Sequence, residues 1–243
     1  MGLDYEAFIH NINLLTQGES NQKFEDLPSI LLAKKIQEKF NCIIATEIMD
    51  PSIQMPLLDR CLKGVVMPWN PAVNQLGWPM MCISKYCEKN NWLLGIKNPK
   101  NLGISTEDSE VNNISAPMEK VWSGVASYSA LPNERKVLIH RGIDCPFRGD
   151  FRAALVHKAA IRTKLANPNI KLFFDPSHSY GPKLKDKIVD GTIEALKVKD
   201  SNGNFVYDGI LIETGTSQTD TYQHITIKEL ENMVNEIIKF REI

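Results

Sequence analysis

The sequence lacks several features that would place the protein in a specialised class. Its 28 Lys and Arg are balanced by 29 Asp and Glu, so it has no basic excess of the kind that nonspecific nucleic-acid binding needs. No apolar run approaches the roughly 20 residues that span a bilayer, and the first residues do not resemble a signal peptide. The five cysteines include no Cys-x-x-Cys pair, which favours reduced thiols. We therefore expect a cytoplasmic protein without nucleic-acid or membrane partners.

Six short apolar runs recur along the 243 residues, each too apolar for a surface strand. They span residues 41–48, 64–67, 92–96, 136–139, 171–174 and 209–212. Segments with helical spacing follow the last three runs, at 150–167, 181–199 and 226–240. This alternation predicts an α/β fold with a parallel sheet. Because no glycine-rich phosphate loop follows the first run, a TIM-barrel-like (β/α) fold is favoured over an open doubly wound sheet. A closed barrel has eight strands, so we expect an incomplete barrel.

Two helices are predicted to frame the strand series. The segment 27–40 has Pro28 in a position suited to a first turn and aligns Leu32, Ile36 and Phe40. The last segment places its apolar residues on one face: Ile227, Leu230, Val234, Ile237 and Ile238. The amphipathic stretch 4–15 predicts one more helix. We thus divide the chain into a helical extension, 1–26, and a barrel domain, 27–243.

Polar side chains follow the strand runs, where the active face of a β/α barrel lies. His178 and Glu213 end two successive runs, and Asp220 comes shortly after. One imidazole and two carboxylates are a ligand set for Mn, Fe, Co or Zn. The alternative for His178 is a loop histidine that hydrogen-bonds a neighbouring backbone group.

Two basic residues, Lys97 and Arg141, also follow strand runs directly. Long cationic side chains at the mouth of a barrel can hold a phosphate or a carboxylate. The alternative is a solvated basic residue paired with a nearby acid. Asn98 and Glu47 lie at the same strand ends and complete the predicted substrate-binding set.

Several motifs together resemble one enzyme family. The stretches "KLFFDPSHSYG", "LLGIKNPKN", "VLIHRGI", "GILIETG" and "IIATEIMDP" are similar to strand-end motifs of the class I 3-deoxy-D-arabino-heptulosonate 7-phosphate (DAHP) synthases and the related 3-deoxy-octulosonate 8-phosphate synthases. The resemblance implies a (β/α)8 barrel that condenses phosphoenolpyruvate with a sugar phosphate, such as erythrose 4-phosphate, in the shikimate pathway of aromatic amino acid biosynthesis. It also implies metal ligands at His178, Glu213 and Asp220, phosphoenolpyruvate binding by Lys97 and Arg141, and catalytic roles for Lys97, Arg141 and His178.

The sequence also departs from the family. The Gly-Pro-Cys and Lys-Pro-Arg motifs of the first two strands are absent, and Pro68 or Trp69 stands where the family has a phosphate-binding arginine. Three explanations remain open. In the first, the first two β/α units belong to a complementing subunit. In the second, the enzyme has rebuilt its mouth, and Cys145 replaces the missing thiolate. In the third, the chain is a regulatory or anion-binding protein without turnover. Cys145 also fits a half-buried loop thiol, and closure by a homo-oligomer is a further expectation.

Overall fold

The computed structural model describes residues 26–100, 117–146, 148–215 and 222–241. Within these residues six strands form one sheet in the order β1 to β6, and every neighbouring pair is parallel. The strands are β1 (Ile44–Glu47), β2 (Val66–Trp69), β3 (Leu94–Lys97), β4 (Lys136–His140), β5 (Lys171–Phe174) and β6 (Gly209–Ile210). Parallel strands in consecutive order need a crossover after each strand, as predicted.

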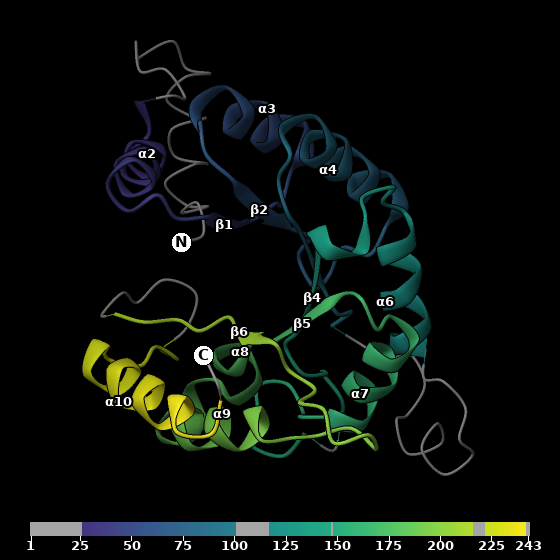
Figure 1. Ribbon diagram of the computed structural model, residues 1–243, viewed down its shortest axis with the longest axis vertical. Coiled ribbons are helices and arrows are strands. Elements are labelled where there is room, and N and C mark those ends of the chain that lie inside the picture. The colour runs from purple at the N-terminus through teal and green to yellow at the C-terminus, as the bar shows by residue number, and fades with distance from the viewer. Residues whose placement is uncertain (1–25, 101–116, 147, 216–221, 242–243) are drawn as a thin grey trace.

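Helices cover the outer side of the curled sheet, and the strands line its inner side (Figure 1). The longer helices are α2 (Pro28–Phe40), α3 (Pro51–Cys61), α4 (Gly77–Asn90), α6 (Pro117–Ser127), α7 (His157–Ala166), α9 (Ile188–Leu196) and α10 (Ile227–Ile238). The shorter ones are η2 (Asn133–Arg135), α8 (Pro176–Tyr180) and η3 (Pro182–Lys187). The ring of elements is open between α2 and α10, so the described chain is a half-barrel of six parallel strands.

The two faces of the sheet pack differently because successive side chains of a strand point to opposite faces. Residues that face the helices join the large core, including Leu94, Leu138 and Leu172. Residues of the inner, concave face form a second apolar cluster, with Met67, Trp69, Val137 and Ile139 at its centre. Gly95 leaves room for the indole in this cluster, since a Cβ there would lie 2.6 Å from the Cβ of Trp69.

The predicted helix at 150–167 is wrong in its first half, because α7 begins only at His157. The preceding residues bind other segments through their backbone. Ala154 forms an antiparallel bridge with Ile143, and the amide of Ala153 donates to the carbonyl of Ser179. These long-range hydrogen bonds replace the local bonds of a helix. The predicted helix at 181–199 is divided into η3 and α9.

The predicted apolar faces of the two framing helices are also only partly buried. In α2 the buried residues are Ile30, Ala33 and Gln37, while Leu32 and Phe40 are exposed. In α10 the buried residues are Met233 and Ile237, while Ile227, Val234 and Ile238 are exposed. Each of these helices borders the opening, and on that side no other described helix packs against it (Figure 1). The predicted extension, 1–26, lies almost wholly outside the described residues, in which no helix is long and apolar enough to cross a membrane.

Candidate active site

Alternation along the strands brings the predicted polar residues to one edge of the concave face. Glu47 and Lys97 are the last residues of β1 and β3, and Arg141 and Asp175 follow β4 and β5 directly. Lys97 is paired in register with Ile139, and Ile139 with Phe173. Because side chains two residues apart share a face, Arg141 and Asp175 lie on the same face as Lys97, one step nearer the mouth.

Lys97 is a buried lysine held between two carboxylates. Its side chain is 2% exposed. Its Nζ lies 3.5 Å from Oδ2 of Asp175 and 4.0 Å from Oε1 of Glu47. The same nitrogen lies 5.7 Å from the centre of the Trp69 ring, within the range of a cation–π contact. Two acids and an indole therefore compensate for the loss of water around this ammonium group.

Arg141 is positioned through its backbone rather than through its guanidinium. Its amide donates to Oδ1 of Asn98, and Nδ2 of Asn98 donates to the carbonyls of Pro99 and Gly142. The residue is 5% exposed, and within the described part of the chain neither Nε nor Nη1 has a hydrogen-bond partner. Burial lowers the pKa of this guanidinium, while the attraction of Asp175 opposes the shift. Asn98 is fully buried and thus positions the loop that carries Arg141.

Asp175 caps the short helix that carries His178. With proline in the first turn of α8, the Asp175 carboxylate accepts a hydrogen bond from the amide of His178 at 3.1 Å. The Nδ1 atom of His178 lies 3.1 Å from Oδ1 and 3.0 Å from Oδ2 of the same carboxylate. Burial raises the pKa of Asp175, but the attraction of His178 and Lys97 and the hydrogen bonds from His178 outweigh it and hold that pKa well below its usual range. The carboxylate therefore stays charged.

Glu213 meets His178 at the mouth, as the strand-end positions predicted. Nδ1 of His178 lies 3.4 Å from Oε1 of Glu213, and Nε2 of His224 lies 3.3 Å from Oε2. Gln223 donates to Oε1 of Glu213 at 2.8 Å and accepts from Arg152 at 2.7 Å. The segment with His224 reaches the mouth because Ile225 pairs with Thr214 in a parallel bridge. Glu213 thus lies between two histidines.

The distance between Nδ1 of His178 and Oε1 of Glu213 fits one edge of a metal site, but the same nitrogen is hydrogen-bonded to Asp175 and must give up that bond to bind a metal. Two ligands of a tetrahedral zinc ion, at bond lengths of about 2.1 Å, lie about 3.4 Å apart. The third predicted ligand, Asp220, lies outside the described residues. Among the residues that are described, no group of three or more His, Cys, Asp and Glu side chains has the arrangement of a metal site. The pair therefore matches the donor chemistry and leaves the rest of the ligand set undefined.

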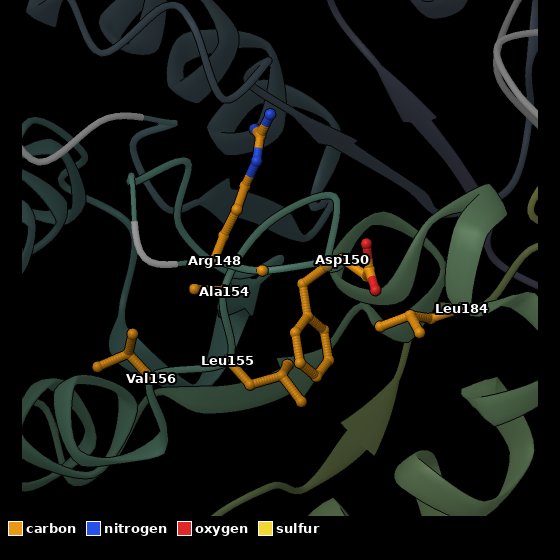
Figure 2. Close-up of a pocket in the computed structure, with 8 residues that line it drawn as sticks. Arg148, Asp150, Ala154, Leu155, Val156 and Leu184 are labelled. Atoms are coloured by element: carbon orange, nitrogen blue, oxygen red, sulfur yellow. The ribbon is translucent and has the colours of Figure 1, made fainter.

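A separate hollow of about 600 Å³ lies beside the loop between β4 and α7 (Figure 2). Its lining includes Arg148, Asp150, Ala154, Leu155, Val156 and Leu184. Arg148 extends away from Leu155 and Val156 in this view. Because its lining residues include none of the predicted site residues, this hollow is distinct from the mouth. Cys145, the suggested replacement thiolate, belongs to the same loop and is buried.

The chain matches no protein-family model and no curated protein. The geometry of the mouth is therefore the basis for assigning a function. Lys97, Arg141, Glu47, His178 and Glu213 are brought together at one edge of the sheet, as the sequence predicted.

Two residues of the mouth, Asp175 and His224, had no predicted role, although Asp175 follows a strand run directly. Asp175 is the carboxylate that contacts both Lys97 and His178, and its signal was the Asp-Pro pair that starts a helix directly after a strand. His224 reaches Glu213 through the bridge between Thr214 and Ile225. That bridge is a tertiary contact with no signal in the local sequence, so His224 was not predictable from the spacing of motifs.

Proposed function

We propose that the chain binds phosphoenolpyruvate at Lys97 and Arg141 and condenses it with a phosphorylated aldose, erythrose 4-phosphate in the first instance, as a DAHP-synthase-type transferase. The observation that carries the proposal is the buried guanidinium of Arg141. Within the described residues its Nε and Nη1 lack hydrogen-bond partners, and the neighbouring strand β3 places Lys97 on the same face. The motif resemblance supports the same ligand, because it assigns both residues to phosphoenolpyruvate.

The energetics of Arg141 favour an anionic ligand. A buried donor without a partner costs about 1–3 kcal/mol, and more when the group is charged. A phosphate or carboxylate supplies several acceptor oxygens in the planar geometry that a guanidinium matches. Lys97 adds a second positive charge, while Asp175 and Glu47 limit the net charge of the mouth. We therefore expect modest affinity that depends on salt.

The residues have separate roles in the proposed reaction. Lys97 and Arg141 neutralise the two anionic groups of phosphoenolpyruvate and orient its C3 towards the aldehyde carbon of the sugar phosphate. Asp175 holds both Lys97 and His178 in position. A divalent ion held by His178 and Glu213 would supply a Lewis acid to the aldehyde oxygen. After the carbon–carbon bond forms, water adds at C2 of the former phosphoenolpyruvate and inorganic phosphate leaves.

A second candidate is a partial synthase that binds the anion without turning it over, as a regulatory or complementing subunit. The six-stranded half-barrel favours this candidate, because a closed barrel builds its mouth from eight loops. The absence of the family's Lys-Pro-Arg motif and of the arginine near Pro68 removes further substrate contacts from the chain. Binding and turnover therefore need separate measurements.

The binding test is titration calorimetry with phosphoenolpyruvate. Arg141→Met should weaken binding about 10- to 100-fold, because charge-assisted hydrogen bonds contribute about 1.5–3 kcal/mol. Arg148→Met is the matched control, since Arg148 lines the separate hollow and should leave the affinity unchanged. Added salt should weaken binding to the unmodified chain. Equal affinities of the chain and Arg141→Met would reject the proposed anion site.

The turnover test measures phosphate release from phosphoenolpyruvate and erythrose 4-phosphate with added Mn²⁺. Release that is lost in His178→Ala while phosphoenolpyruvate binding persists would support the synthase. Binding without release would support the second candidate. A polypeptide with the two missing β/α units should then restore release if the chain is one half of a split enzyme.

A further inference from the structure

Lys97 has the surroundings of a reactive amine as well as those of an anion ligand. Its Nζ lies 3.5 Å from Asp175 and 4.0 Å from Glu47, beyond the 2.7–3.2 Å or so of a good hydrogen bond. The two carboxylates hold the amine by charge from either side. Asp175 is fully buried, whereas the side chain of Glu47 is 32% exposed, so of the two carboxylates only that of Glu47 is in contact with solvent. The amine is thus fixed in place, and its nitrogen forms no short hydrogen bond with either carboxylate.

We propose that Nζ of Lys97 forms a covalent imine with the keto group of a small 2-oxo acid. A lysine on a rigid strand end, shielded from water, is the residue type that forms Schiff bases with carbonyl compounds. The inference uses the Arg141 anion site of the proposed function but does not need its condensation chemistry.

The groups that surround Lys97 can accept and return the proton that imine formation requires. The ammonium gives one proton to Glu47, and the free amine attacks the keto carbon, so that a carbon–nitrogen bond forms and the carbonyl oxygen becomes the hydroxyl of a carbinolamine. Glu47 returns the proton to this hydroxyl, which leaves as water while the nitrogen lone pair forms the C=N bond. The product is a protonated imine, and its positive charge stays between Asp175 and Glu47, where the ammonium charge was.

Arg141 selects an acid rather than a neutral ketone. Lys97 is in register with Ile139, and Arg141 follows Ile139 by two residues on the neighbouring strand, so both cations lie on the concave face. A 2-oxo acid carries its carboxylate on the carbon next to the keto group. The guanidinium N–H groups of Arg141 that have no partner among the described residues match this carboxylate, while the keto carbon lies towards Lys97.

The test is reductive trapping of the full chain with pyruvate and sodium borohydride, followed by intact mass and peptide mapping. One equivalent should add the mass of pyruvic acid less one oxygen atom, and the adduct should map to Lys97. Lys97→Arg, which keeps the charge, should lose the adduct. Lys100→Arg should retain it in full, because Lys100 is a half-exposed lysine three residues away that contacts Asp144. Acetone, which lacks the carboxylate, should give less adduct than pyruvate.

Peptide mapping of the unmodified chain keeps the proposal falsifiable even if Lys97→Arg fails to fold. No adduct, an adduct spread over exposed lysines, or equal labelling by acetone and pyruvate would each overturn it. These outcomes are separate from those of the proposed function. Phosphoenolpyruvate binding without a pyruvate adduct would reject only the imine, whereas a Lys97 adduct without phosphoenolpyruvate binding would reject only the synthase assignment.

Discussion

Tyr207 hydrogen-bonds two histidines in the core on the helix side of the sheet. Its hydroxyl lies 2.8 Å from Nδ1 of His140 and 2.8 Å from Nδ1 of His157. A phenol has one proton to donate, so one imidazole accepts it and the other donates its own Nδ1–H to the phenol oxygen. His140 is fully buried, and its Nε2 has no hydrogen-bond partner in the described part of the chain. A proton added to His140 would therefore be poorly solvated.

The stability of the fold should consequently fall in mild acid. Burial, and secondarily the repulsion from His157, lowers the pKa of His140 to about 3. The unfolded chain protonates this residue near pH 6.5, as an ordinary histidine does. Because the folded state does not take up the proton until about pH 3, the free energy of unfolding should decrease as the pH falls from about 6.5 towards 3. Urea unfolding at a series of pH values measures this slope.

A comparison with His140→Gln separates the contribution of His140 to the pH dependence of stability from that of the carboxylates, which also titrate in acid. The variant should be less stable at neutral pH because it disturbs the bond to Tyr207, but its stability should depend less on pH between about 6.5 and 4. Identical slopes in the variant and the unmodified chain would show that His140 does not control the acid response.

At the scale of elements, the loop that joins β4 to α7 fixes the position of Arg141. Gly142 has a φ of +80°, and a Cβ at this position would lie 2.5 Å from the carbonyl oxygen of Ala153. We expect Gly142→Ala to destabilise the fold by about 1–3 kcal/mol, through the left-handed backbone and the collision. It should also weaken phosphoenolpyruvate binding, because the carbonyl of Gly142 anchors Asn98.

Gly149→Ala is the matched control for this loop. Gly149 also has a positive φ, +59°, but its Cβ would meet no atom of the described residues within 4 Å. The control should therefore show the backbone cost alone, about 1 kcal/mol, with unchanged anion binding. Thermal unfolding and calorimetry of both variants test the difference. An equal loss of stability in the two variants would mean that the contact with Ala153 relaxes without cost.

The strands were predictable because each is a short, apolar run whose composition suits a sheet buried on both faces. Residues 136–139 and 171–174 match β4 and β5 almost residue for residue. The helical pattern at 150–156 was misleading, because this segment exchanges backbone hydrogen bonds with Ile143, Ser179 and Tyr180, which are distant in sequence. Sequence spacing records local periodicity and does not record such pairings.

In the candidate site, too, some features were predictable from the sequence and others were not. Lys97, Arg141, Glu47 and Glu213 were predictable because parallel strands bring their carboxyl ends to one edge, and their positions next to apolar runs are visible in the sequence. The contacts that these residues form with one another were not predictable. That Asp175 joins Lys97 to His178, and that His224 faces Glu213, depends on the curvature of the sheet and on a bridge formed after β6.

At the scale of the whole molecule, the two helices that border the opening carry exposed apolar side chains. Leu32 and Phe40 of α2 are 47% and 63% exposed, and Ile227 and Ile238 of α10 are 66% and 51% exposed. These two helices border the opening from opposite sides (Figure 1). In a closed β/α barrel the outer helices form a continuous ring, so each helix packs against the next.

We therefore expect the isolated chain to self-associate through the borders of the opening, since exposed apolar patches and strand edges both promote association. Sedimentation velocity over a range of concentrations should detect the association. The double variant Phe40→Gln, Ile227→Gln should shift it to higher concentration. Trp78→Gln is the matched control, because Trp78 is 69% exposed but lies on α4, away from the opening. If the control weakens association as much as the double variant does, general surface hydrophobicity is responsible, and the opening has no special role.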